Sequence, residues 1–345
     1  MKISPKTAKR TETLVNLLKK SQAVLIVMQD NPDPDSIASA LGLRKIANSQ
    51  SEVQCTITYG GSISRAENKA LVKYLSVNIR PLKEIELTRY DLLCMVDTQP
   101  ETGNNSLPED FLPDIVIDHH PMREMTRQCI FTDIRRDYGS TSTIFCEYLK
   151  HMEINIDTQL ATALLYGIRS DTQDLGRETI KADMDALYFV YPLANKRMLS
   201  QIQRGSFDRE YFQVLVKAFM NARIYQNNVI ITSLGHVDNP GMIGEVADLL
   251  LRDDNASCTI CYGLTEEKIL ISIRTSSENL QADKMIADIA AGNGTGGGHK
   301  TYAGGQVSLA GLSNSAAAEL EKKIYKKFLK ILNLPEHPYT KLITI

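Results

Sequence analysis

The sequence has no long apolar run and no sign of an export signal. No segment approaches the roughly 18 uninterrupted apolar residues that a membrane-spanning helix needs. The N-terminus, from Met1 to Lys20, is polar and basic and lacks the apolar centre of a signal peptide. The sequence therefore predicts a cytoplasmic protein with no membrane partner.

The net charge is small, and cysteines are few. The 39 basic and 41 acidic residues give a formal net charge of -2, which argues against a surface that coats nucleic acid. Any nucleic-acid contact must be local, and short ligands fit better than long duplexes. Among the 6 cysteines only Cys258 and Cys261 are close, and a four-ligand zinc site usually needs a second such pair. We expect ordinary reduced cysteines in the core.

The length of 345 residues favours two domains, and 43% apolar and 23% charged residues are typical of globular chains. Apolar runs rich in β-branched residues, at Val24–Met28, Leu92–Val96 and Asp114–Ile117, alternate with helix-like segments and indicate parallel strands. We expect an α/β fold with a doubly wound, mainly parallel sheet, a smaller C-terminal α/β domain and an active-site cleft between them. The expected boundaries are 1–190 for the metal-binding domain, 191–225 for a helical connector and 226–345 for a substrate-binding domain.

Alternating apolar patterns in the second domain predict strands at Val229–Leu234, Ala256–Tyr262 and Lys268–Ile273. A glycine-rich stretch, Gly292–Gly305, then precedes a last strand and a helix at Asn314–Leu332. The stretch could be a flexible loop. Glycines also let backbone N–H groups approach a phosphate closely, so a phosphate-binding backbone is the alternative.

Acidic residues follow the predicted strands of the first domain. Asp33 and Asp35 come after the first strand, Asp97 comes after a later one, and Asp171 follows a predicted helix. Ligands of parallel α/β sheets bind at the carboxyl ends of the strands, so these side chains are expected to converge. About four negative charges in one crevice are costly unless divalent cations neutralise them. The series predicts a metal-dependent hydrolase.

Each of these acidic motifs also has a structural alternative. The segment Asn31–Asp35 could be a solvated turn, because Asn, Asp and Pro are common turn formers. The later aspartates could cap a helix or a turn. Asp118-His119-His120 is more informative, since two adjacent histidines at a strand end are hard to bury without partners. One could bind a metal while the other faces a substrate phosphate.

The second domain offers a candidate anion site. Backbone N–H groups of Gly296, Gly297 and Gly298 could contact a phosphate, with His299 adding a side-chain contact. Arg274, at the end of a predicted strand, could grip the same anion with its planar guanidinium. The glycines form neither a P-loop, which needs a following Gly-Lys-Ser/Thr, nor a dinucleotide-binding fingerprint.

Taken in order, these motifs resemble those of the DHH phosphoesterases that carry a DHH-associated C-terminal domain. The likeness covers nearly the whole chain and is greatest to the nanoRNase/pAp-phosphatase branch, relatives of the RecJ exonucleases. It implies two divalent ions in the first domain, most commonly Mn²⁺ with Mg²⁺ or Co²⁺ as alternatives, and substrate capture by the second. The matching motifs are Asn31-Pro32-Asp33-Pro34-Asp35, Asp97, Asp118-His119-His120, Asp171 and Gly296-Gly297-Gly298-His299.

The resemblance also implies residue roles. Asp97 would bridge the two ions, and His120 would contact the scissile phosphate. The family pattern has a further histidine four residues before the first aspartate of the pair, where this chain has Gln29. By position, Asp33 and Asp97 would bind one ion, and Asp35, Asp97, His119 and Asp171 would bind the other.

Gln29 is the main departure from the family pattern. An amide oxygen is a weaker, neutral ligand than imidazole for manganese, so the first site could be weak, filled only with substrate, or selective for a harder ion. Asp30 is the neighbouring residue that could substitute for the missing ligand.

The activity implied is metal-dependent hydrolysis of phosphodiester bonds in short oligonucleotides or dinucleotides, as in an oligoribonuclease-like exonuclease. Hydrolysis of pAp is compatible with it. The expected partners are short single-stranded RNA or DNA or a nucleotide, and a homodimer is left open. Two alternatives remain: a cyclic-dinucleotide or polyphosphate hydrolase, and a nucleotide-binding regulatory module in which Gln29 has disabled one metal site.

Overall fold

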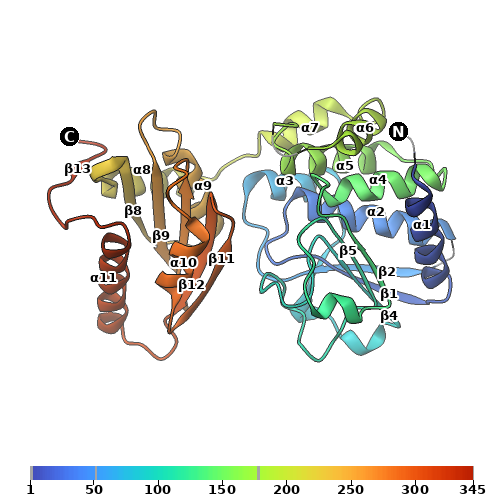
Figure 1. Cartoon of the computed structure of the whole chain (residues 1–345), viewed down its shortest axis with the longest axis horizontal. Helices are drawn as coiled ribbons and strands as arrows, with labels where there is room; N and C mark the ends of the chain where they lie inside the picture. The colour runs from blue at the N-terminus through green and yellow to red at the C-terminus, as the bar shows by residue number, and fades with distance from the viewer. Residues whose placement is uncertain (1–2, 51–52, 177–178, 345) are drawn as a thin grey trace. The chain divides into compact units, whose positions relative to one another are not determined.

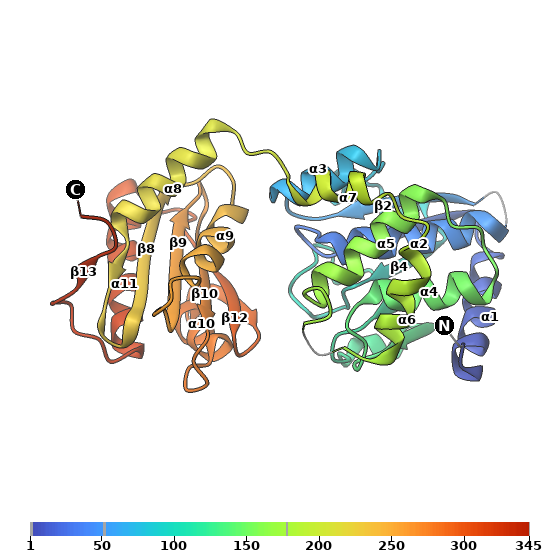
Figure 2. The ribbon, with the colours of Figure 1, turned by 90° about the horizontal axis from the view of Figure 1, so that it is seen from above.

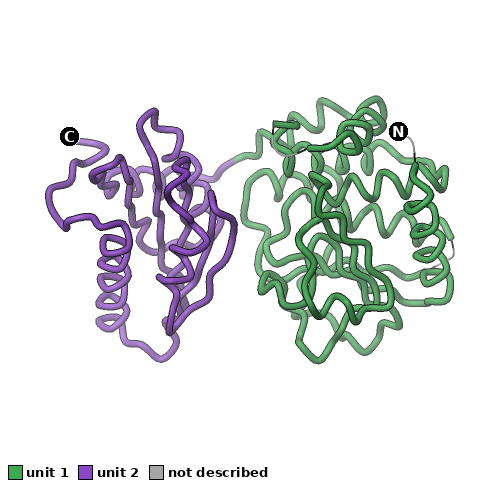
Figure 3. The backbone as a smooth tube through the Cα atoms, in the orientation of Figure 1, with its two compact units in different colours: residues 1–206 green, residues 207–345 purple. Residues whose placement is uncertain are grey.

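The computed structural model describes residues 3–50, 53–176 and 179–344. The chain divides into two compact units, Met1–Ser206 and Phe207–Ile345, here called the first and the second unit (Figure 3). Each has its own sheet and its own buried core.

The first unit contains a six-stranded sheet in which the paired strands are parallel. The strand order is β3-β2-β1-β4-β5-β6, so the order reverses between β1 and β4 in the middle of the sheet. This topology confirms the expected α/β fold with a parallel sheet. The strands are β1 (Ala23–Val27), β2 (Gln54–Tyr59), β3 (Arg80–Pro81), β4 (Leu92–Val96), β5 (Ile115–Asp118) and β6 (Phe131–Ile134).

Two helices of this unit begin at polar caps. The side chain of Ser140 accepts a hydrogen bond from Thr143 N at the start of α4 (Thr141–His151). Asp157 does the same for α5 (Thr158–Asp171), which fixes where both helices begin. The other helices of the unit are α1 (Pro5–Leu18), α2 (Pro34–Gln50), α3 (Ala66–Tyr74), α6 (Lys181–Val190) and α7 (Lys196–Gln203), with short 3-10 turns η1 (Leu82–Glu84), η2 (Leu87–Arg89) and η3 (Met125–Gln128).

Both faces of this sheet are buried. On one face, Val24 and Ile26 pack in a core with α1, α2, α4 and α5, and Figures 1 and 2 show α2, α4 and α5 on this side of the strands. On the other face, Leu25 and Val27 lie under loops and 3-10 turns. Alternate residues of a strand face opposite sides, so burial on both sides explains the continuous apolar runs in the sequence.

The second unit contains a seven-stranded mixed sheet of order β11-β12-β10-β9-β8-β7-β13. Strands β8 and β9 are parallel, and the other neighbouring pairs are antiparallel. The strands are β7 (Arg223–Ile224), β8 (Val229–His236), β9 (Cys258–Leu264), β10 (Lys268–Thr275), β11 (Gly294–Gly298), β12 (Tyr302–Ser308) and β13 (Thr340–Lys341).

Helices pack on both faces of the second sheet. The cores on the two faces contain alternate residues of β9: Cys258 packs in one and Cys261 in the other, both as free, buried thiols. No helix in the described parts of the chain combines the length and apolar character needed to cross a membrane. The helices of this unit are α8 (Arg209–Asn221), α9 (Gly241–Leu250), α10 (Ala282–Ala290) and α11 (Asn314–Ile331), with the turn η4 (Gln226–Asn228).

The structure contradicts one of the two alternatives for the glycine-rich stretch, the flexible loop. Gly294–Gly298 forms the edge strand β11, and the strand after it begins at Tyr302, inside the predicted glycine-rich range. The loop interpretation is therefore wrong. Part of the reason is packing: a Cβ on Gly296 would lie 2.8 Å from Ile286 Cγ1, and one on Gly305 would lie 2.5 Å from the same atom. These two glycines let α10 pack closely on the edge of the sheet.

Candidate metal centre

The predicted acidic residues meet where the strand order of the first sheet reverses. Strands β1 and β4 are neighbours there, with Asp33 and Asp35 after the first and Asp97 directly after the second. Open α/β sheets bind ligands at such a reversal, outside the carboxyl ends of the strands. Asp33 caps α2, since its Oδ1 accepts a hydrogen bond from Ser36 N at 2.9 Å, and Pro34 begins that helix.

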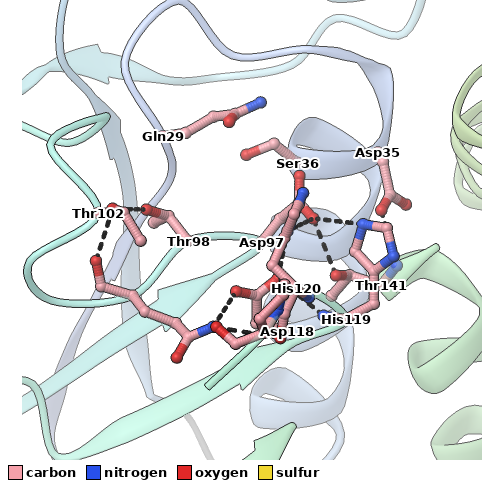
Figure 4. A network of polar contacts seen from close by, with 12 residues as sticks. Gln29, Asp35, Ser36, Asp97, Thr98, Thr102, Asp118, His119, His120 and Thr141 are labelled. Carbon is pink, nitrogen blue, oxygen red and sulfur yellow. Dashed lines mark hydrogen bonds and ion pairs between the residues drawn. The ribbon is translucent and has the colours of Figure 1, made fainter. Parts of the chain in front are cut away.

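Asp97 is buried and has one unsatisfied oxygen. Its side chain is 1% exposed. Its backbone has a φ of +59°, a left-handed conformation that costs a non-glycine residue about 1 kcal/mol or more. Oδ1 accepts a hydrogen bond from Thr141 Oγ1 at 2.9 Å (Figure 4), whereas the buried Oδ2 has no hydrogen-bond partner. A buried carboxylate oxygen without a partner calls for a proton or a cation.

The carboxylate of Asp35 is held at the N-terminus of α4. Its Oδ2 accepts a hydrogen bond from Thr141 N at 2.7 Å, and its Oδ1 accepts one from Ser142 N at 2.8 Å. Helix N-termini have unpaired N–H groups and a positive partial charge, so they orient this acid firmly. A Cβ on Gly167 would lie 3.1 Å from Asp35 Cα. The glycine lets α5 pass close to α2, and α5 ends at Asp171.

His119 has the tautomer that a metal ligand needs. Its Nδ1 lies 3.0 Å from the carbonyl oxygen of Tyr138, which can only accept, so Nδ1 carries the proton. Nε2 then presents a lone pair. It lies 3.3 Å from Asp171 Oδ2 and 3.7 Å from Asp97 Oδ1, is buried, and makes a hydrogen bond to neither. Metal-binding histidines commonly have this second-nitrogen contact with a carbonyl group.

Four of the predicted ligands therefore converge. One potential ligand atom from each lies within 4.8 Å of all the others. The set offers three carboxylates and one imidazole, a donor combination that suits divalent ions such as Mn²⁺. These four residues, called the four-ligand cluster below, are Asp35, Asp97, His119 and Asp171.

The acids of this site repel one another. Burial and the charge of Asp171 raise the pKa of Asp33 to about 6 and that of Asp35 to about 7. Burial and the charges of Asp35 and Asp33 raise the pKa of Asp97 well above its usual range. Two like charges 4 Å apart repel by about 4 kcal/mol at an effective dielectric constant of about 20. A bound cation would remove this cost, so the residues fit a metal site.

His119 responds to the same charges. Burial lowers its pKa, but the contact with Asp171 and the charges of Asp171 and Asp35 outweigh burial and raise the pKa to about 10. Without a cation, the ring would take up a proton to balance the acids.

Asp118 orients the second histidine rather than offering free oxygens. Its Oδ1 accepts hydrogen bonds from His119 N at 2.7 Å and from His120 Nδ1 at 2.8 Å, and its Oδ2 accepts one from Gln99 Nε2 at 2.7 Å. Burial would raise the pKa of Asp118, but these contacts with His120 lower it. The His120 side chain is 39% exposed, so its ring can be reached from solvent.

Asp33 lies next to the four-ligand cluster, and each of its oxygens accepts one hydrogen bond. Its Oδ2 accepts a hydrogen bond from Gln29 Nε2 at 2.7 Å, while Gln29 Oε1 accepts one from Asn104 Nδ2 at 3.1 Å. Asp30, the residue considered as a substitute ligand, accepts a hydrogen bond from Ser106 Oγ at 2.6 Å. The position at which the family pattern has a histidine is therefore used here for hydrogen bonding.

Arg274, predicted to bind an anion, is engaged with an acid. Its Nε lies 2.5 Å from Asp248 Oδ1, its Nη1 donates to Ser272 Oγ at 2.7 Å, and its side chain is 14% exposed. Binding a phosphate through Nε would require exchange with Asp248, and the predicted role of Arg274 stays a prediction.

The predicted glycines differ in their surroundings. A Cβ on Gly297 would meet nothing within 4 Å, whereas one on Gly298, which has a φ of +152°, would lie 2.4 Å from the carbonyl oxygen of Tyr302. The rings of His299 and Tyr302 lie 4.6 Å apart. Gly297 pairs with Gly304, and Arg274 pairs with Tyr302. Paired residues share a face of the sheet, and so do residues two positions apart on one strand, such as Tyr302 and Gly304. Gly297, Tyr302 and Arg274 therefore lie on one face.

Three contributors to the site were not identified from the sequence. Thr141 donates to Asp97, Gln99 donates to Asp118, and the backbone of Tyr138 binds His119. The Ser140 cap places Thr141 at the N-terminus of a helix, but it does not indicate that Thr141 contacts Asp97. No sequence signal indicates that a particular backbone carbonyl group will contact a histidine.

Comparison with known proteins agrees with this geometry. The DHH family, N-terminal domain, matches residues 23–168, and the DHHA1 domain matches residues 226–326. The uncharacterized protein MJ1633 of Methanocaldococcus jannaschii is 33% identical over 325 residues, covering 92% of this chain and 66% of that protein. The cyclic-di-AMP phosphodiesterase GdpP of Bacillus subtilis is 26% identical over 338 residues, covering 93% of this chain and 50% of that protein.

A solved structure has a similar fold over the whole chain. An exopolyphosphatase-related protein from Bacteroides fragilis has a TM-score of 0.72 at 16% identity, covering 96% of this chain and 98% of that one. This likeness shows a common fold. With two consecutive family domains in the expected order, the chain belongs to the DHH phosphoesterase superfamily.

Proposed function

We propose that this protein is a divalent-metal-dependent phosphodiesterase that hydrolyses short oligonucleotides or dinucleotides. One observation carries the proposal: two members of the four-ligand cluster at the strand-order reversal, Asp97 and His119, each have a buried side-chain atom, Oδ2 and Nε2, without a hydrogen-bond partner. A cation would satisfy converging ligand atoms that have no hydrogen-bond partner. Membership of a phosphoesterase superfamily supports a phosphoester as the bond that is broken.

The four-ligand cluster would hold one ion, with Mn²⁺ as our first choice and Mg²⁺ or Co²⁺ as alternatives. A second ion would be held by Asp33 and Asp97. When bound, such ions polarise phosphoryl oxygens and make water more acidic. The protein supplies fixed geometry: Thr141 orients Asp97, the N-terminus of α4 orients Asp35, and the Tyr138 carbonyl group orients His119.

His120 would act on the substrate directly. Its Nδ1 is bound to Asp118, which leaves Nε2 of a solvent-reachable ring to contact a phosphoryl oxygen. Donation from His120 would stabilise charge that develops on that oxygen.

The second unit would bind the part of the substrate beyond the reacting phosphate. We assign this role to the backbone of Gly296, Gly297 and Gly298, to His299 and to Arg274. Of the three glycines, Gly297 has the most open surroundings, which supports a close contact between its backbone and a ligand.

A cyclic dinucleotide is a second candidate substrate. The relatives GdpP of Bacillus subtilis and PdeA of Listeria monocytogenes, at 26% and 24% identity, are cyclic-di-AMP phosphodiesterases. Both align with more than nine-tenths of this chain, but the chain spans only 50% and 48% of their lengths. The substrate therefore has to be found by assay.

The test is a substrate panel with purified protein. Short RNA and DNA oligomers, pAp, linear and cyclic dinucleotides and polyphosphate are each incubated with Mn²⁺, Mg²⁺ or Co²⁺ and with a chelator. We expect metal-dependent cleavage of an oligonucleotide or dinucleotide, abolished in Asp97→Asn and retained in the exposed-loop control Asp110→Asn. Cleavage that persists in chelator would refute the mechanism. Nucleotide binding without cleavage would favour the regulatory module.

A further inference from the structure

We propose that Asn104 fixes the orientation of the Gln29 side-chain amide, so that the NH₂ group of Gln29 faces Asp33. Without substrate, the protein then holds a single divalent ion, in the four-ligand cluster. The inference rests on the proposed function, because it concerns the same site. It assigns to Asn104 a positioning role that controls entry of the second ion.

The hydrogen bonds of Asp33 distinguish the two ion positions. Both oxygens of Asp33 accept one, from Ser36 N at 2.9 Å and from Gln29 Nε2 at 2.7 Å, and the second donor is a side-chain NH₂ group rather than the backbone donors that hold Asp35. In the four-ligand cluster, by contrast, Asp97 Oδ2 and His119 Nε2 are unsatisfied. A first ion therefore gains contacts that the fold leaves open, whereas a second ion at Asp33 competes with an existing N–H donor.

The second group of potential metal ligands among the described residues does not provide an alternative. It combines Asp97, Asp118, His119 and His120. Both oxygens of Asp118 and the Nδ1 of His120 are occupied in hydrogen bonds. An ion there would compete with the contacts that orient His120.

Asn104 determines which end of the Gln29 amide faces Asp33. Thr98 Oγ1 donates to Asn104 Oδ1 at 2.7 Å, Thr102 Oγ1 donates to the same oxygen, and Asn104 Nδ2 donates to Gln29 Oε1 at 3.1 Å. Each amide has one donor end and one acceptor end, so the orientation of the first sets that of the second. Turning Gln29 alone would put its oxygen against the carboxylate of Asp33 and its NH₂ group against that of Asn104.

Turning both amides together avoids this conflict. The hydroxyl groups of Thr98 and Thr102 can accept as well as donate, so they tolerate either orientation of Asn104. In the reversed arrangement, Gln29 Oε1 would face Asp33 and could bind an ion there. Entry of the second ion is thus coupled to reversal of the Gln29–Asn104 pair, which an arriving phosphate with its own oxygen ligands would favour.

The experiment counts Mn²⁺ ions per chain by equilibrium dialysis without substrate, with electron paramagnetic resonance to distinguish isolated from coupled Mn²⁺. We expect one tightly bound, isolated ion in the unaltered protein and a second that binds at least about tenfold more weakly. In Asn104→Asp, the new carboxylate can only accept, so it turns the Gln29 NH₂ group toward itself. Affinity for the second ion should then rise by about tenfold, with the coupled signal appearing at lower Mn²⁺.

Three further variants complete the test. Asn48→Asp adds the same charge at an exposed position of α2 and should leave both affinities unchanged. Gln29→His should strengthen the second ion as Asn104→Asp does. Asn104→Ala, which frees the Gln29 amide, should also strengthen it, whereas a purely structural role for Asn104 predicts weakening. Gln29→Leu, with neither donor nor acceptor, should bring no gain comparable to Gln29→His.

The outcomes separate this inference from the proposed function. Two equally tight ions in the unaltered protein would overturn the inference and leave the metal-dependent hydrolase intact. No bound ion under any condition would overturn both. If Asn104→Asp and Asn104→Ala keep the thermal stability of the unaltered protein but do not strengthen the second ion, Asn104 is not the controlling residue.

Discussion

His119 Nε2 lies 3.3 Å from Asp171 Oδ2 in a buried position where the neutral ring has no proton to offer, because its Nδ1 hydrogen points to the Tyr138 carbonyl group. Two electron-rich atoms at this distance need a positive charge between them or on one of them. The same pair can therefore hold a cation, or hold a proton when the cation is removed.

Asp171→Asn should weaken Mn²⁺ binding by at least about a hundredfold and reduce hydrolysis accordingly, because it removes one anionic ligand of the cluster. Titration calorimetry measures the binding and a phosphodiester assay the activity. Asp174→Asn is the matched control, since Asp174 is exposed and pairs with Arg169 outside the cluster. Equal losses in the two variants would contradict the assignment of Asp171.

Metal-free protein should become less stable as pH rises from about 4 to 8. The folded-state pKa values of Asp33 and Asp35, about 6 and 7, exceed the ordinary value of 3.8, so the native state binds more protons in this range. The free energy of unfolding then falls with rising pH. The pKa of His119, raised to about 10, acts in the same direction above pH 6.5.

Calorimetry in chelator and in Mn²⁺ checks this pH dependence. We expect Mn²⁺ to raise Tm by at least about 2–4 °C more at pH 8 than at pH 5, since it replaces protons that are lost on ionisation. The variant Asp35→Asn should show a smaller difference. A Tm in chelator that does not change between these pH values would show that the acids do not repel one another as described.

His120→Ala should lower kcat by about a hundredfold or more while Mn²⁺ binding persists, because the ring would contact the substrate rather than the ion. The ion count comes from dialysis and kcat from steady-state kinetics. His236→Ala removes an exposed histidine of the second unit and serves as the control. Loss of the ion in His120→Ala would make His120 a ligand instead.

Substitution of two neighbouring glycines of β11 by alanine should affect different properties, stability at Gly296 and KM at Gly297. Gly296→Ala should lower the free energy of unfolding by about 1–3 kcal/mol, because its Cβ would lie 2.8 Å from Ile286 Cγ1. Gly297→Ala, with open space around its Cβ, should leave stability unchanged and raise KM. Denaturant unfolding and kinetics provide the two measurements. An unchanged KM in Gly297→Ala would remove this glycine from the substrate site.

Much of the first sheet could be predicted because its strands are buried on both faces. Leu92–Val96 was expected as a strand and is one, since an uninterrupted apolar run in an α/β pattern has few other uses. The sequence does not predict the strand β6 (Phe131–Ile134), because it contains an acidic residue, Asp133, which is buried in an ion pair with Arg135. A buried ion pair places charged residues in a strand, so the sequence lacks the apolar pattern by which buried strands are identified.

The convergence of the cluster could be anticipated, but its hydrogen bonds could not. Strand ends position Asp97 and His119 by topology alone, and topology can be read from a sequence. The contact from Asn104 to Gln29 depends on the path of a loop, and nothing in the sequence of that loop fixes which amide end faces its partner. The glycine strand β11 was missed because glycine is rare in strands and usually indicates a turn.

Asp35 serves the fold as well as the chemistry, because its two oxygens satisfy two backbone N–H groups of α4 that would otherwise be buried without partners. A descendant that had lost catalysis would still need an acceptor there, whereas nothing in the architecture requires the Nε2 of His119. Among related sequences, an aspartate at the position of Asp35 is thus a poor marker of activity. A missing histidine at the position of His119 is a good marker of a pseudoenzyme.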